Sequence, residues 1–326
     1  MKAKFSSFAV LVVLASLNRA LACATQTTAA PVESTLVASA STAAATLVER
    51  AIVVLEQHRS ISAKCRQRVY LFDRQIVGSG TYVQGPSQYH WLRVTLRIQA
   101  GNEIGTLQQV CDGRQLWIYH QLGGEPSLKR VDLPTVLRAM DEAPQGAEMG
   151  PIASWVGIAG LPRLLRSLGA AFDFAELSQR QLGQARVWLV RGTWRSERLA
   201  ALLPNQKSTI ERGQAADLSA LAEVVPDHVL LYLGCDDLFP HRIEFRRVAP
   251  SNWAGSTRKG NRPLVISEWF DVELNGSLSP HQFVYQPGNM EVKDYTAGFL
   301  ADMGLSGSPL IEPSTAATTN PGETPR

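Results

Sequence analysis

The sequence lacks the short motifs that identify most catalytic and cofactor-binding sites. It contains no G-x-S-x-G elbow, no P-loop, no G-x-G-x-x-G loop and no H-E-x-x-H zinc motif. Its six histidines are dispersed, and lone histidines on strands or at the ends of elements are usually structural. The adjacent carboxylates Asp236 and Asp237 fall in a predicted turn between two strands, where a solvated turn is the simpler interpretation. The sequence therefore predicts a protein that is not an enzyme and holds neither a cofactor nor a metal ion.

Cysteine is scarce. One of the four cysteines, Cys23, stands close to the N-terminus, which leaves three for the body of the chain. Cys65, Cys111 and Cys235 are an odd number, and their separations fit neither a C-x-x-C motif nor a His/Cys metal site. One disulfide would be compatible with an oxidising compartment, but the simpler interpretation is three buried free thiols. We expect free thiols.

Neither positive nor negative charge is in large excess. The 32 basic and 29 acidic residues give a net charge of +3. The arginines are scattered rather than clustered, which is typical of a solvated surface and not of a nucleic-acid interface. No uncharged apolar run reaches the roughly 20 residues that a membrane-spanning helix needs. The sequence thus predicts no nucleic-acid partner and no spanning helix.

The N-terminal residues follow the order of a secretory signal peptide. Two early lysines give a positive start, residues 8–17 form an apolar run, and the small residues at positions 20–22 precede Cys23. We therefore expect export to the periplasm and a mature chain that starts at Cys23. Two interpretations of Cys23 stay open: acylation, which would attach the protein to a membrane, and ordinary cleavage beside an incidental cysteine.

Composition divides the chain into four segments. Residues 1–22 are the expected signal peptide, and residues 23–46 form an Ala/Thr/Ser-rich linker. Residues 47–305 are long enough for one large domain. The linker and the Ser/Pro/Thr-rich tail at residues 306–326 contain too little apolar surface to order themselves. We expect one folded domain between two flexible tethers.

Alternation of apolar and polar residues dominates the domain. In residues 88–99, Leu92, Val94, Leu96 and Ile98 alternate with polar residues, so one face of this strand should be buried and the other solvated. A helical period instead predicts helices at residues 47–58, 133–140, 151–169 and 174–182, and residues 205–227 read as a polar loop with a short helix. Further strands are expected at residues 68–72, 75–84, 106–111, 115–119, 186–195, 228–234, 241–248, 263–274 and 281–285.

The order of these elements predicts an α+β fold. Long runs of consecutive strands with little strand–helix–strand alternation favour an antiparallel sheet. The helices are concentrated at the start and in the middle of the domain, where they can cover one face of that sheet. We expect a strongly curved antiparallel sheet with helices packed on its concave side.

Three segments resemble the LolA/LolB-like periplasmic lipoprotein carriers. They are GTYVQGPSQYHWLRV at residues 80–94, VCDGRQLWIYHQ at residues 110–121, and the closing FVYQPGNMEV at residues 283–292. The resemblance implies an unclosed β-barrel around an apolar cavity that binds lipid or the acyl chains of lipoproteins, with a membrane surface as a further partner. One departure concerns the hand-over of lipoprotein: Gly85 stands where the carriers have an arginine before the proline.

The strand residues supply the candidate ligand-binding side chains. Aromatic residues favour pleated surfaces for packing alone, but a curved sheet lined by them would also form an apolar cavity. We expect Trp117 and Trp188 on or near the concave side, whereas strict alternation places Trp91 on the face of Arg93. The candidate lining residues are Leu92, Val94, Leu96, Trp117, Tyr119, Trp188 and Phe270.

Two alternatives to a lipid carrier or acceptor stay open. The first is a structural or regulatory envelope lipoprotein with a filled core and protein partners. The second is a hydrolase whose site matches no known motif. A cavity along the strand aromatics would favour the carrier, and a convergent acid, base and nucleophile would favour the hydrolase.

Overall fold

The computed structural model describes residues 35–71, 74–142, 152–248 and 261–305. The expected signal peptide, Cys23 and the C-terminal tail lie outside these ranges. Within them, twelve strands form one sheet in the order β12-β6-β5-β4-β3-β2-β1-β11-β10-β9-β8-β7. Every neighbouring pair is antiparallel except β12 and β6. The strands are β1 (Ile61–Leu71), β2 (Arg74–Gln84), β3 (Trp91–Ala100), β4 (Glu103–Asp112), β5 (Gln115–Gln121), β6 (Ser127–Asp132), β7 (Phe172–Leu182), β8 (Ala185–Trp194), β9 (His228–Gly234), β10 (Pro240–Val248), β11 (Asn261–Leu274) and β12 (Val292–Asp294).

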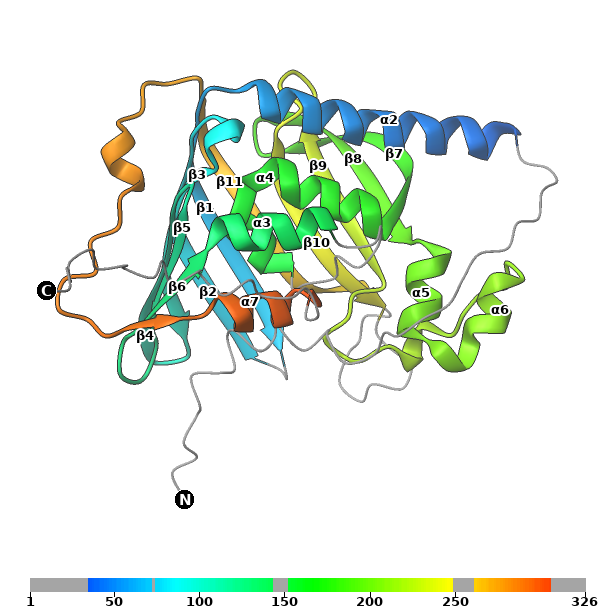
Figure 1. The fold of residues 1–326 in the computed structure, drawn as a ribbon. Coiled ribbons are helices and arrows are strands. Elements are labelled where there is room, and N and C mark those ends of the chain that lie inside the picture. Colours follow the sequence, from blue (N-terminus) through cyan, green and yellow to red (C-terminus); the bar gives the residue numbers. More distant parts are fainter. Residues whose placement is uncertain (1–34, 72–73, 143–151, 249–260, 306–326) are drawn as a thin grey trace, which may run out of the picture.

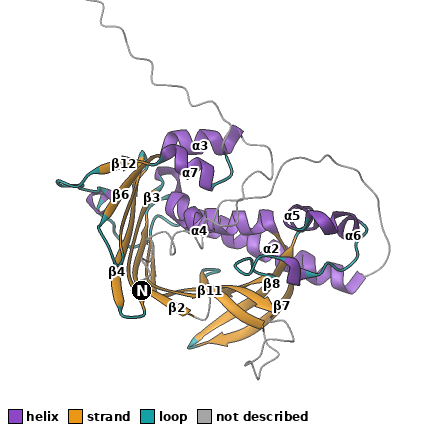
Figure 2. Ribbon diagram, turned by 90° about the horizontal axis from the view of Figure 1, so that it is seen from below, coloured by secondary structure: helices purple, strands orange, loops and turns teal. Residues whose placement is uncertain are grey.

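The sheet is strongly curved and does not close into a barrel. Its outermost strands are β12 and β7, and they pair with β6 and β8 respectively but not with each other across the described residues. Figure 2 shows the strands bent around the helices, so that one face of the sheet is concave and covered while the other is convex. We call these the inner face and the outer face. The expected α+β architecture, an unclosed curved sheet with helices on its concave side, is confirmed.

Glycine lets strands β2 and β3 approach closely at one position. At Gly80 in β2 an added Cβ would lie only 1.8 Å from the carbonyl oxygen of Thr95 in β3. No other residue fits such a contact without moving the backbone. Gly80 therefore permits the close pairing of β2 with β3 at this position.

The inner face is covered by helices α2 (Thr35–Gln57), α3 (Leu133–Glu142), α4 (Ile152–Ala171) and α7 (Thr296–Asp302), as Figure 1 shows. Helix α2 contacts α4 and strand β7. It begins twelve residues before the predicted start at residue 47, inside the stretch expected to be a linker. That stretch is rich in alanine, which has the highest intrinsic helix propensity.

Two predictions for the middle of the chain need correction or extension. Residues 174–182, expected to be helical, form most of strand β7, because their pairing with β8 outweighs the helix-forming residues of the segment. Residues 205–227 do form a largely irregular excursion. It is preceded by helix α5 (Ser196–Leu202) and contains η2 (Pro204–Gln206), α6 (Lys207–Glu211) and η3 (Leu218–Ala220).

The prediction of a strand at residues 281–285 is wrong. These residues begin with the short 3-10 helix η4 (Pro280–Phe283) and belong to a segment, residues 276–291, that crosses the outer face of β3 and β4. Figure 1 shows this orange segment outside the sheet. Phe283 stacks on Trp91 with ring centres 5.4 Å apart, and Arg93 donates to the carbonyl of Gln282 at 2.8 Å. The proline at the start of η4 has no backbone N–H to donate to a neighbouring strand. Side-chain contacts, rather than a ladder of backbone hydrogen bonds, hold this segment on the sheet.

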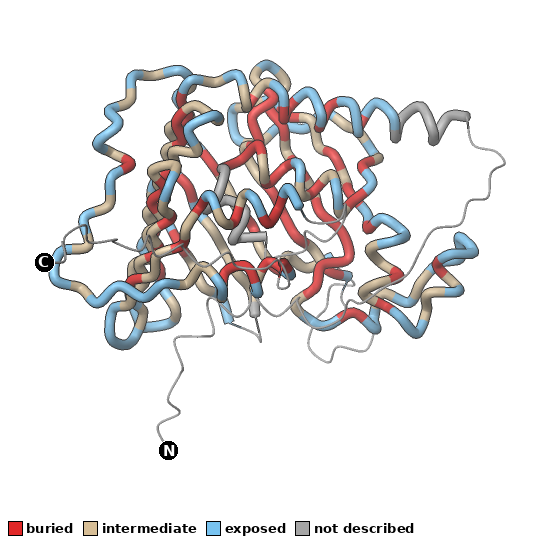
Figure 3. Tube along the Cα trace, in the orientation of Figure 1, coloured by how far each residue is buried: buried red, intermediate tan, exposed pale blue. Residues whose placement is uncertain are grey.

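Burial follows the alternation of the strands and the apolar stripes of the helices (Figure 3). Leu92, Val94, Leu96 and Ile98 are buried in one core with residues of α2 and α4, as the alternation in this strand predicts. Trp91 lies on the opposite face, beside Phe283, which confirms its predicted direction. Among the described helices, none combines the length and the apolar character that a membrane span requires.

Candidate functional site

The inner face of the sheet brings together four of the seven candidate lining residues. Leu92, Val94 and Leu96 point inward from β3 and pack in the core. Trp188 in β8 pairs with Leu233, a core residue, so it points to the same side and is half-buried. The predicted concave position of Trp188 is confirmed, and it shares its face with Trp194 six residues further along β8.

The other three candidates lie on the outer face. Trp117 and Tyr119 alternate with the buried Leu116 and Ile118, so they point away from the helices. Trp117 instead stacks on Tyr285, with ring centres 5.4 Å apart. Phe270 alternates with the buried Trp269 and is exposed. The expectation that these three line the concave side is wrong, because the register of β5 and β11 assigns the inner face to their neighbours.

Part of the inner face is apolar but only half-buried. Ile76 in β2, Leu107 in β4 and Val265 in β11 all occupy inward positions, yet the helices do not cover them fully. Trp188 and Leu177, on β8 and β7, have the same partly covered apolar character. We call these five residues the apolar strip. When a hydrocarbon chain displaces water from an apolar surface of this kind, the free energy of the complex falls.

A polar contact fixes helix α4 to strand β2. Gly160 has φ of +69° inside α4 and is followed two residues later by Pro162. At this irregular turn the backbone N–H of Leu161 donates to the hydroxyl of Tyr82 at 3.0 Å and to Oε1 of Gln84 at 3.3 Å. Tyr82 also donates to Gln84, and burial raises the pKa of Tyr82 well above its usual value.

This β2–α4 contact was not predicted, although its ingredients are visible in the sequence. Tyr82 and Gln84 alternate on β2 so that both point inward, and the Gly-Leu-Pro at residues 160–162 interrupts the helical pattern. The contact joins residues 77 and 79 positions apart, which no local pattern indicates. It holds helix α4 against the end of β2 on the inner face.

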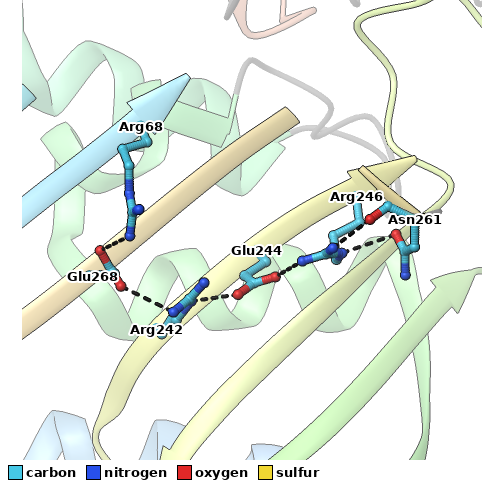
Figure 4. A network of polar contacts seen from close by, with 6 residues as sticks. All are labelled: Arg68, Arg242, Glu244, Arg246, Asn261 and Glu268. Atoms are coloured by element: carbon cyan, nitrogen blue, oxygen red, sulfur yellow. Dashed lines mark hydrogen bonds and ion pairs between the residues drawn. The ribbon is translucent and has the colours of Figure 1, made fainter. Parts of the chain in front are cut away.

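An ion network crosses the outer face of β1, β11 and β10 (Figure 4). Arg68 and Arg242 both contact Glu268, at 2.6 and 3.2 Å. Arg242 also pairs with Glu244 at 2.5 Å, and Glu244 in turn binds Arg246. The carboxylate of Glu244 is only 1% exposed, so each guanidinium offsets its loss of hydration. We interpret the network as cross-strand ties that hold this half of the sheet.

The three cysteines and Asp237, the other candidate reactive groups, lie in surroundings that suit a structural role. Cys65, Cys111 and Cys235 are free, as expected, although Cys235 is half-buried. Burial raises the pKa of Cys65 and of Cys111 to about 12, which keeps both thiols protonated and unreactive. Asp237 pairs with His241 at 3.3 Å in the turn between β9 and β10. No group of three potential metal ligands occurs among the described residues.

Similarity of this chain to known proteins was found among solved structures. No protein-family model matches it, and no curated protein sequence matches it either. Three solved structures illustrate what it is similar to. A DUF1329 family protein from Desulfovibrio piger is 8% identical with a TM-score of 0.32, covering 76% of this chain and 98% of that one.

Two further structures cover a similar share of the chain. An outer membrane lipoprotein-sorting protein domain from Vibrio parahaemolyticus is 9% identical with a TM-score of 0.31, covering 74% of this chain and 97% of that one. LprF from Mycobacterium bovis is 8% identical with a TM-score of 0.32, covering 73% and 95%. At these values the similarity carries no conclusion about the function of this chain.

Proposed function

We propose that this protein binds lipid, or the acyl chains of lipoproteins, on the inner face of its sheet and carries out no chemical step. The observation that carries the proposal is the apolar strip, a set of inward-pointing apolar side chains on five strands that are only partly buried. Burying a hydrocarbon chain stabilises a complex by about 0.8 kcal/mol for each CH₂ group removed from water. A partly covered apolar surface inside an open sheet supports that function.

We also propose that the protein is exported to the periplasm and acts there as a carrier or an acceptor. The signal-peptide pattern and the resemblance of three segments to LolA/LolB-like carriers support this setting. Cys23 is the candidate for acylation and membrane attachment. Cys23→Ser should move an acylated protein from the membrane fraction to the soluble fraction, whereas an unchanged distribution would indicate simple release.

One observation favours the structural alternative. The inward side chains of β3 and the apolar residues of α2 and α4 already form a contiguous core, so a large part of the inner face is filled. A structural or regulatory lipoprotein with protein partners would have such a core. The two functions differ in whether the apolar strip takes up a ligand.

A titration with cis-parinaric acid, a fluorescent fatty acid, tests the proposal. We expect binding at one or a few sites, with quenching of tryptophan emission through Trp188 at the apolar strip. Trp188→Asp should weaken binding, while Trp117→Asp on the outer face should leave it unchanged. Absence of saturable binding to the folded protein would favour the structural alternative.

A further inference from the structure

Basic side chains gather where the inner face meets the free edge of the sheet. Lys129 in β6 pairs with the inward residue Ile118, and Lys293 in β12 pairs with Lys129. His120 in β5 pairs with Ser127 and with the inward residue Leu107. We call His120, Lys129 and Lys293 the basic corner; Figure 2 shows β6 and β12 at this edge, close to α7.

Lys129 lies close to an aromatic ring, one carboxylate and a second lysine. The amine of Lys129 lies over the ring of Tyr295, 3.7 Å from the ring centre. The hydroxyl of Tyr295 donates to Asp302 at 2.5 Å, and the charges of Asp302 and Lys293 both act on Lys129. Burial and the charge of Lys293 lower the pKa of Lys129, while Asp302 raises it. An additional anion would therefore be favoured at this corner.

His120 adds a hydrogen-bond donor without a partner. Its Nδ1 lies 3.1 Å from the hydroxyl of Ser127, and its Nε2 is buried with no hydrogen-bond partner within the described ranges. When Ser127 donates to Nδ1, the ring proton resides on Nε2, which is then a buried donor. A buried polar atom left unpaired costs about 1–3 kcal/mol, so an acceptor from a ligand would remove that cost.

An apolar row leads from the basic corner into the inner face. The paired inward positions across β6, β5, β4, β3 and β2 are, in order, Ser127, His120, Leu107, Leu96 and Gly80. The two positions nearest the edge are thus polar, and the next three are two leucines and a glycine. Leu107 is also a member of the apolar strip, so a half-buried apolar side chain directly adjoins His120 at the charged edge.

We propose that the basic corner holds the anionic headgroup of an amphiphile whose alkyl chain lies along Leu107 on the inner face. The headgroup is a carboxylate or a phosphate, which accepts from Lys129, Lys293 and the Nε2 of His120. The proposal rests on the lipid-binding function above and names its substrate class: single-chain or double-chain lipids with a negative headgroup.

The test compares cis-parinaric acid with its uncharged methyl ester. Lys129→Met keeps the apolar stem and removes the charge, so the Kd for the acid should rise about tenfold or more while the Kd for the ester stays within about twofold. Lys129→Arg should restore binding of the acid. Lys64→Met is the matched control, because Lys64 is an exposed lysine on the outer face, paired with Asp271 at 2.7 Å.

The outcomes separate this proposal from the lipid-binding function itself. If neither probe binds the unaltered protein, the lipid-binding function fails. If both bind with equal affinity and Lys129→Met changes neither, the function stands and the headgroup site is refuted. Displacement of the bound acid by oleate or by oleoyl lysophosphatidate then distinguishes carboxylate from phosphate. Equal displacement by uncharged monooleoylglycerol would also overturn the headgroup site.

Discussion

Replacing Gly160 with alanine would place a methyl group directly in the β2–α4 contact. The new Cβ would lie 2.1 Å from Oε1 of Gln84 and 2.6 Å from the hydroxyl oxygen of Tyr82, closer than nonbonded atoms approach. Both side chains are buried and hydrogen-bonded, so they have little freedom to move aside. Alanine would also have to adopt the φ of +69° that Gly160 has now.

Two costs add up in this variant. A left-handed backbone conformation costs an alanine about 1–2 kcal/mol. Displacing Tyr82 and Gln84 from the N–H of Leu161 leaves a buried donor unpaired, which costs about 1–3 kcal/mol. We therefore expect Gly160→Ala to lower the free energy of unfolding by about 2–5 kcal/mol.

The same helix supplies a matched control. Gly169 has no positive φ, and the nearest atom to an added Cβ is Oε1 of Glu49 at 4.0 Å. Because alanine has a higher helix propensity than glycine, Gly169→Ala should be neutral or stabilising by up to about 1 kcal/mol. Urea unfolding followed by tryptophan fluorescence measures both variants. Equal stabilities for the two alanine variants would refute the strained, packed geometry at Gly160.

Two further predictions concern the two faces of the sheet and the pH dependence of stability. Val94→Asp buries a carboxylate in the core and should cost about 3 kcal/mol or more, whereas Arg93→Asp on the outer face should cost about 1 kcal/mol; equal losses in urea unfolding would mean that the faces are assigned wrongly. Burial and the nearby Arg191 and Arg246 lower the pKa of His228 to about 4. Since its pKa returns to about 6.5 on unfolding, the unfolded state binds more protons between these values, so stability should fall as the pH drops from 6.5 to 4. One such histidine contributes a slope of up to about 1.4 kcal/mol per pH unit, and a slope that persists unchanged in His228→Gln would rule this histidine out.

The sequence predicted those parts of the fold that depend on local alternation. Leu92 to Ile98 alternate strictly with polar residues, and the structure buries them as a set. Strand β6 was missed because Leu128 and Val131 are buried on opposite faces and two basic residues separate them. The basic corner could not be recognised without that strand.

Only part of the candidate lining was predicted correctly, because the register of a strand decides which face of the sheet each side chain points to. Trp117 is aromatic and lies on a strand, as expected, but its inward neighbours Leu116 and Ile118 already occupy the core. A shift of one residue in the register moves a side chain from one face of the sheet to the other, and aromatic side chains fit either face. The place of residues 276–291 on the outer face likewise depends on distant contacts with Trp91 and Arg93.

Native mass spectrometry of the protein, purified without detergent from the envelope fraction, tests the lipid-binding function most directly. We predict a bound species of lipid mass that dissociates on activation, extracts into organic solvent and carries a negative headgroup. Trp188→Asp should lose this species while Trp117→Asp retains it. A folded protein that carries no lipid, and that also takes up no added fatty acid, would contradict the proposed function.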